Sequence, residues 1–419
     1  MSRADPGQSP QLHRPANALA VAGANGGGRF ARGPACRPAT LHPLRRGNLR
    51  PARRADTGGA GQGFPGRQLL AGRRQQGHLG GAHEPVMMPM LSRVAESIYW
   101  MNRQIERAEN IARATETTLD MAIEGTMQPG RLWNGLVCTF GDQADFWQRH
   151  GLADQPHVIQ FLAFDRENPN SIVSCLAQAR ENARTVREMI STAMWQEINR
   201  FYLEVRGASG SHGELENPLE FLTEVKRASQ LITGVTDATM AHGEAWHFAR
   251  MGRLIERADK TSRVLDVEHF FRPHPESTAD EADDELTGPI DWSSVLESAS
   301  ALEMYRKQHG RISRRNVAEF LLLDREFPRA VHFCLMKAEE SLLAITGGMK
   351  GTYSTTAEQQ MGRLRAELDY AAIDEILAGS HGLHGFIDHL QGRLNAASDA
   401  VHETFFATRP TGLPAESTR

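Results

Sequence analysis

The sequence is short of the features that mark secreted and membrane proteins. It has four cysteines in 419 residues, Cys36, Cys138, Cys175 and Cys334, and no two of them form a Cys-x-x-Cys pair. This pattern indicates reduced thiols rather than a disulfide framework. No apolar run approaches the roughly 18 residues that a membrane-spanning helix needs, and no secretory signal peptide is recognisable. We therefore expect a cytoplasmic protein without a membrane partner.

The motifs of the common catalytic and cofactor-binding sites are also missing. The sequence has no Gly-x-x-x-x-Gly-Lys-Ser/Thr phosphate loop, no Gly-x-Ser-x-Gly nucleophile elbow and no His-Glu-x-x-His metal helix. Their absence lowers the expectation of an enzyme without excluding one. The residues therefore predict no cofactor, no metal and no identifiable catalytic group.

Residues 1–86 contain no lysine, isoleucine, tyrosine or tryptophan. Their 13 arginines and three acidic residues give a formal charge of +10, whereas the 34 basic and 48 acidic residues of 87–419 give −14. A segment so poor in large apolar side chains cannot bury enough surface to offset the entropy lost on ordering. We predict that 1–86 is a disordered Arg/Gly/Ala/Pro-rich extension and that 409–419 is a disordered tail.

Three explanations of the extension compete. It is an arginine-rich transit peptide, a basic tail for nucleic acid or anionic membrane, or an over-extended gene start. We favour the third, because GC-rich codons yield Gly, Ala, Arg and Pro in any frame and because Met87, Met88 and Met90 precede the first periodic segment. The remaining chain is acidic, so no nucleic-acid partner is expected for it.

The rest of the folded chain, 87–408, contains an internal sequence repeat. Residues 101–113 match residues 251–263 at seven of 13 positions, at an offset of 150. The block 161–169 matches 320–328 at an offset of 159, with the same order of blocks in both copies. Between these blocks Trp133 matches Trp292, and 150–151 match 309–310, also at 159. Three ordered matches are hard to obtain by chance. We predict one domain with two similar halves, at about 90–206 and 219–406.

The repeated unit is helical. Apolar residues between Val94 and Leu119, and again between Phe248 and Leu265, recur at alternating steps of three and four, which predicts helices with one apolar face. Sustained period-two alternation is absent, so the fold class is all-α, a helical bundle. Further helices are expected at about 131–150, 157–167, 171–206, 219–241, 291–309, 311–326, 329–346, 355–378 and 383–405.

Charged residues recur beside both apolar stripes. Spacings of three, four and three relate Arg103, Glu106, Asn110 and Arg113, and the same spacings relate Arg253, Glu256, Lys260 and Arg263. Arg107 and Arg257 directly follow the glutamates.

Three interpretations of these rows are open. They are solvated faces with exposed ion pairs, or a functional anion or metal site, or a buried crossed pair in which each glutamate meets the arginine of the other half. The crossed pair is the structural interpretation that the duplication favours, and it would fix register more than it would add stability.

Two acidic tripeptides precede prolines at matched positions. Asp165-Arg166-Glu167 and Asp324-Arg325-Glu326 are expected to cap or pair with the N-termini of the following helices. A cluster of Glu106, Glu256, Asp165 and Asp324 could instead hold metal, but neither glutamate has the Glu-x-x-His spacing of two-metal bundles. Cys175 and Cys334 also occupy matched positions and are expected to be small core residues.

The segment 90–113, with its Glu106-Arg107 dipeptide, resembles the opening of the bacterial alpha-E domain family. Residues 161–169, 187–199 and 248–266, the last with Glu256-Arg257, are similar to it as well. The resemblance extends over roughly 88–406 and carries the family's Glu-Arg positions onto these four residues.

The resemblance implies a setting more than an activity. Proteins of this family typically occur with ATP-grasp ligases and transglutaminase-like peptidases, which implies a non-catalytic partner or scaffold in a bacterial system that makes or modifies peptides. The alternative is an enzyme of that system that acts through a carboxylate/arginine site on the paired Glu-Arg helices. The family has no established catalytic residue to carry over.

Overall fold

A computed structural model describes residues 90–125, 127–208, 218–267 and 291–407. Every regular element in these ranges is helical and no strand occurs among them, so the all-α prediction is confirmed. None of the described helices combines the length and apolarity that crossing a bilayer requires. The predictions for 1–86 and for the 409–419 tail lie outside the described residues. Descent of the two halves from a duplication stays a prediction.

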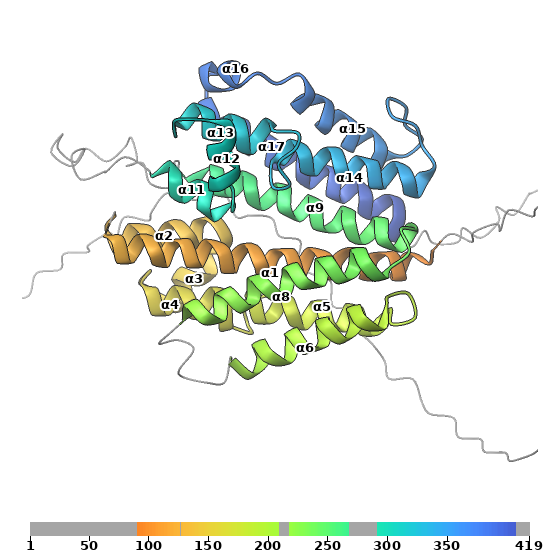
Figure 1. The fold of residues 1–419 in the computed structure, drawn as a ribbon, viewed down its shortest axis with the longest axis horizontal. Coiled ribbons are helices and arrows are strands. Elements are labelled where there is room, and N and C mark those ends of the chain that lie inside the picture. The colour runs from red at the N-terminus through yellow and green to blue at the C-terminus, as the bar shows by residue number, and fades with distance from the viewer. Residues whose placement is uncertain (1–89, 126, 209–217, 268–290, 408–419) are drawn as a thin grey trace, which may run out of the picture. The chain divides into compact units, whose positions relative to one another are not determined.

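Figure 1 shows the arrangement of these helices. In chain order they are α1 (Ser92–Glu124), α2 (Pro129–Phe140), α3 (Gln143–His150), α4 (Gln155–Ile159), the π-helical turn η1 (Gln160–Phe164), α5 (Ile172–Thr185), α6 (Thr192–Ala208), α8 (Pro218–Thr239), α9 (Glu244–Leu265), α11 (Trp292–Ser298), α12 (Leu302–Gln308), α13 (Arg314–Leu323), α14 (Val331–Thr346), α15 (Thr356–Asp369), α16 (Ile373–Ala378), α17 (Gly382–Val401) and η3 (His402–Phe406).

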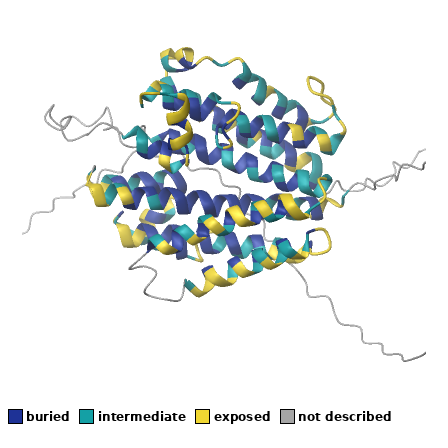
Figure 2. Ribbon diagram, in the orientation of Figure 1, coloured by how far each residue is buried: buried dark blue, intermediate teal, exposed yellow. Residues whose placement is uncertain are grey.

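Helices α1 and α9 lie side by side at the centre of the bundle. They run parallel, because the Met90 backbone N–H donates to Glu244 Oε2 near both N-termini (3.1 Å) and Arg103 meets Glu256 further along. Helix α1 also packs against α5 and α8, and α9 packs against α14. Every residue from 101 to 115 is buried, so this stretch of α1 is enclosed on all sides (Figure 2).

The packing does not follow the expected boundary between halves near 207–218. Helix α8 comes after that boundary, yet it packs against α1 and α6, which come before it. Figure 1 shows α8 on the same side of the bundle as α5 and α6. The order of helices along the chain therefore does not give their grouping in space.

A glycine allows the close crossing of α1 and α9. A Cβ atom placed on Gly252 would lie 2.4 Å from the backbone oxygen of Tyr99. The matched position on α1 is Asn102, which is buried and donates from its side-chain amide to Ile98 O (3.0 Å). The two positions are therefore not interchangeable, and only α9 presents bare backbone at the contact.

Several expected helices are shorter than predicted. The range 171–206 is interrupted at residues 186–191, 291–309 at residues 299–301, and 355–378 at residues 370–372. These interruptions contain neither proline nor glycine, so the sequence carried no breaker signal. At the first, Ser191 Oγ accepts from Met194 N (3.0 Å) and begins a new helix. At the second, Ser300 has a positive φ of 47°. Side-chain capping and tertiary packing here outweigh apolar periodicity.

Substitution of Gly252 tests the close crossing. We expect Gly252→Ala to lower the free energy of unfolding by about 2 kcal/mol, because the atom that the new methyl group meets is backbone and cannot rotate away. Gly234→Ala on α8 is the matched control, since no atom lies within 4 Å of its Cβ position. That change should raise stability by about 0.5 kcal/mol. Urea unfolding followed by circular dichroism measures both, and equal effects would contradict the crossing.

Candidate functional site

Two crossed ion pairs join α1 to α9. Arg107 donates from Nε to Glu256 Oε1 (2.6 Å) and from Nη2 to Oε2 (3.1 Å). Arg257 donates from Nε to Glu106 Oε1 (2.7 Å) and from Nη2 to Oε2 (2.8 Å). Both contacts are bidentate, the geometry in which a guanidinium binds a carboxylate most strongly. The crossed arrangement that the duplicated sequence favoured is therefore present in the structure.

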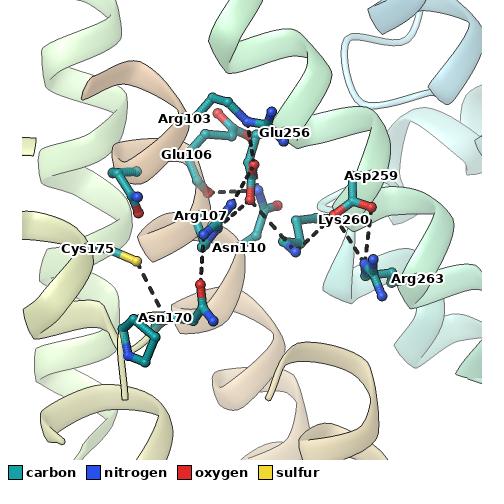
Figure 3. A network of polar contacts seen from close by, with 12 residues as sticks. Arg103, Glu106, Arg107, Asn110, Asn170, Cys175, Glu256, Asp259, Lys260 and Arg263 are labelled. Atoms are coloured by element: carbon teal, nitrogen blue, oxygen red, sulfur yellow. Dashed lines mark hydrogen bonds and ion pairs between the residues drawn. The ribbon is translucent and has the colours of Figure 1, made fainter. Parts of the chain in front are cut away.

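Further cations surround Glu256 (Figure 3). Arg103 donates from Nε to Glu256 Oε2 (2.9 Å), and its Nη1 donates to Tyr99 Oη (3.1 Å) and to Ser398 Oγ (2.7 Å). Lys260 Nζ lies 3.7 Å from Glu256 Oε1. The Glu256 side chain is fully shielded from solvent. Three cations therefore surround one buried carboxylate.

Glu106 is surrounded by a different set of residues. Besides Arg257, it receives Nη1 of Arg329 (3.3 Å) and the Nδ2 amide of Asn110 (3.1 Å). Arg329 also donates to Glu109 Oε1 (2.6 Å) and to Asn110 Oδ1 (3.1 Å). Arg329 precedes α14 and was not among the sequence candidates.

The positive charges near the two glutamates come from different positions of the repeated unit. Lys260 on α9 matches Asn110 on α1, and Asn170 matches Arg329 in the turns before α5 and α14. Asn170 accepts from Arg107 Nη1 (2.7 Å). Besides its crossed arginine, Glu256 has two cations from the helices, Arg103 and Lys260, whereas Glu106 has one cation from the turn, Arg329. Alignment of the repeated blocks carries this signal, because both turn residues directly follow the matched prolines.

The two glutamates remain ionised. Burial by itself would raise the pKa of Glu106, but the charges of Arg257 and Arg329 outweigh it and lower the pKa to about 2. Burial likewise opposes ionisation of Glu256, and the charges of Arg107 and Arg103 lower its pKa to about 2. A carboxylate that is ionised and held by several cations has no tendency to exchange a proton with a substrate near neutral pH.

The acidic tripeptides lie in the turns and do not cap the following helices. Asp165 Oδ1 accepts from Glu167 N (2.8 Å), and Asp324 Oδ1 accepts from Glu326 N (2.8 Å). Helix α5 is instead capped by Ser171, whose Oγ accepts from Ser174 N (3.2 Å). The expected capping of helix N-termini by these aspartates is wrong, because each carboxylate already binds the backbone of its own turn.

The arginines of the same tripeptides face outward. Arg166 and Arg325 are exposed, and Arg325 Nη2 donates to Asp369 O (3.3 Å). Within the described ranges no group of three or more Asp, Glu, His or Cys side chains is placed to hold a metal ion. The structure therefore does not bring the four acids of the metal hypothesis into such a group.

The matched cysteines are core residues, as expected. Cys175 Sγ donates to Asn170 O (3.5 Å) and Cys334 Sγ donates to Pro328 O (3.4 Å). Burial raises the pKa of each thiol to about 12, so both stay protonated. Neither thiol has the lowered pKa of a reactive cysteine.

Arg253, which matches Arg103, lacks the hydrogen-bond partners that Arg103 has. Its guanidinium forms no hydrogen bond or ion pair in the described part of the chain, and its Nε is shielded from solvent without an acceptor. Among the six Glu-Arg candidates on α1 and α9, it is the one with no ion pair or hydrogen bond to either glutamate.

We call the two crossed pairs, together with Arg103, Lys260 and Arg329, the seam. Removal of one of its buried charges tests its contribution to stability. We expect Glu256→Gln to lower the free energy of unfolding by about 3 kcal/mol, because it leaves buried cations without their counter-charge. Glu181→Gln is the control, since Glu181 pairs with Arg184 on an exposed face, where such a pair is worth about 0.5 kcal/mol or less. Chemical denaturation measures the difference, and similar losses in the two variants would contradict a buried seam.

Stability should also depend on acid in a defined direction. The pKa of each seam glutamate is about 2 in the fold, below its ordinary value of 4.5, so its contribution is complete above about pH 4.5 and is lost as the pH falls toward 2. The free energy of unfolding, measured in urea at several acidic pH values, should fall through this window. The double variant Glu106→Gln, Glu256→Gln should show a shallower fall, and an unchanged slope would contradict the assignment.

Comparison with known proteins identifies a family for this chain. A family model described as a predicted alpha-helical domain with a conserved ER motif matches residues 90–406. An uncharacterised protein of Mycobacterium bovis and one of Mycobacterium tuberculosis are each 26% identical over 326 residues, which cover 69% of this chain and 35% of the relative. No solved structure is significantly similar. This chain thus spans about a third of the length of these relatives, and it belongs to the Alpha-E family.

Proposed function

We propose that this Alpha-E protein is a non-catalytic partner or scaffold in a bacterial system that makes or modifies peptides, together with an ATP-grasp ligase and a transglutaminase-like peptidase. The observation that carries the proposal is that the side chains of both Glu-Arg motifs are fully occupied by partners within the chain. Each glutamate is buried and bound by the arginine of the other helix and by further polar groups. Residues held in this way build a rigid body rather than a reaction centre.

The length of the relatives supports a partner role. The matched region makes up 35% of the mycobacterial proteins, so most of each relative lies outside it. A domain that forms part of a longer chain in its relatives has other polypeptide beside it there. We infer that polypeptide of the same kind contacts the Alpha-E domain of this chain, in the cytoplasm. The ligase and the peptidase are the partners that the family resemblance implies.

The alternative, an enzyme acting through the Glu-Arg helices, requires one of these side chains to touch a substrate. Glu106 and Glu256 are 2% and 0% exposed, and Arg107 is buried beside them. A substrate could reach these three side chains only after α1 and α9 had separated, which would break both crossed pairs. Arg257 is partly exposed, but Glu106 binds its Nε and Nη2. The geometry therefore favours the partner role.

Co-expression of the full chain with the ATP-grasp ligase of the same bacterium tests the proposal. We expect a complex of fixed stoichiometry in light scattering after size exclusion, and a ligase whose rate changes when the chain is present, while the chain alone turns over nothing. The ligase mixed with an unrelated helical protein is the control. Separate elution of the two proteins at about 10 μM each, a concentration at which a partner of micromolar affinity stays bound, would count against the proposal.

The double variant Glu106→Gln, Glu256→Gln separates the alternative. If it stays folded and still binds the ligase, but the chain has a turnover of its own that the variant loses, the enzyme interpretation replaces the scaffold. A variant that loses stability and binding together supports the structural assignment.

A further inference from the structure

Three arginines follow one face of α9. Arg250, Arg253 and Arg257 are spaced by three and four residues, so they project from the same side of the helix, and all three are partly exposed. Arg257 is held by Glu106, and Arg250 contacts Ser341 Oγ (3.4 Å) and Glu340 Oε2 (3.6 Å). The central arginine, Arg253, is the member of this row without a partner in the described part of the chain.

The acids near Arg253 are already engaged. The charged groups that act on it are those of Arg257, Glu106, Asp237 and Arg250. Glu106 is bound by two other arginines, and Asp237 Oδ1 accepts from Trp246 Nε1 (3.0 Å). Burial, followed by the charge of Arg257, lowers the pKa of Arg253. Among the described residues no side chain forms an ion pair or a hydrogen bond with Arg253, which is costly in a site partly removed from water.

The matched arginine shows what such a site accommodates. Arg103 binds a carboxylate oxygen of Glu256 and the hydroxyls of Tyr99 and Ser398. Ala249 stands where Tyr99 would be matched, at the offset of 150, so the residue one turn before Arg253 supplies no hydroxyl. The same guanidinium position thus holds oxygen ligands on one side of the seam and has none on the other.

We propose that Arg253, flanked by Arg250 and Arg257, binds an oxyanion supplied from outside the chain, a carboxylate or a phosphate group. The planar guanidinium fork suits both groups, and a flanking pair of arginines would add to the attraction. The ligand would supply to Arg253 the kind of oxygen contacts that Arg103 receives from Glu256 and Tyr99. This site does not depend on the ligase or the peptidase, so it stands or falls apart from the scaffold role.

Ligand-dependent stability of the full chain tests this site. Thermal unfolding is measured at constant ionic strength with chloride replaced stepwise by inorganic phosphate, and in a second series by acetate. For a ligand at about ten times its dissociation constant, the midpoint of the wild-type chain should rise by about 2 °C. Arg253→Gln should abolish the rise. Arg227→Gln on α8, which removes an exposed arginine paired with Glu224, should keep it.

The two series identify the source of the oxyanion. A rise with phosphate alone assigns a phosphate ligand, a rise with acetate alone assigns a carboxylate, and a rise with both assigns a general oxyanion site. No rise in either series, or an equal rise in the wild type and Arg253→Gln, would overturn the proposal.

A second measurement needs no loss-of-charge variant. The Nε–H resonance of Arg253, identified by its absence from the spectrum of Arg253→Lys, should move as phosphate or acetate is added to the wild-type chain. A resonance that stays in place at saturating concentrations of both would overturn the proposal even if Arg253→Gln failed to fold.

Discussion

The parallel contact between α1 and α9 constrains the rest of the bundle. Their backbones approach closely at Gly252, and just beyond that point two bidentate pairs, Arg107 with Glu256 and Arg257 with Glu106, cross between the helices. Each glutamate directly precedes its arginine, and in this parallel arrangement both pairs form in a single register. A slip of one helical turn would leave four charges buried without partners, which is far more costly than the pairs are stabilising. The pairs therefore specify the arrangement.

Enclosure of this contact explains why polar residues occur where a core would be expected. Residues 101–115 of α1 are buried on every side, and their charged members find partners on α9 and in the turn before α14. Lys260 lies near Glu256 and Arg329 binds Glu106, so each glutamate has a cation in addition to its crossed arginine, although the two surroundings differ in sequence. A buried network of this kind is acceptable only when its members are satisfied, and most of them are.

Arg253 is a charged residue beside this network that lacks a hydrogen-bond partner among the described residues. Its counterpart Arg103 is bound by a carboxylate and two hydroxyls. Arg253 lies in a partly exposed row of arginines, and it has no side-chain acceptor among the described residues. A saturated seam beside an arginine that has no acceptor among the described residues fits a rigid binding protein with an anion site. It fits less well with a catalytic centre, for which the glutamates would have to exchange protons.

Local patterns in the sequence determined the helical class, the two central helices and the residues of the crossed pairs. Periods of three and four encode which side chains share a helix face, and the repeated Glu-Arg dipeptide encodes which residues can meet its copy. Tertiary structure alone decided that Ser398 contacts Arg103, that Arg253 does not join the seam, and that α8 packs with α1 and α6. It also decided the helix breaks at 186–191 and 299–301. The reason is physical: these contacts join residues far apart in the chain, and burial and competing partners set them, which local spacing does not record.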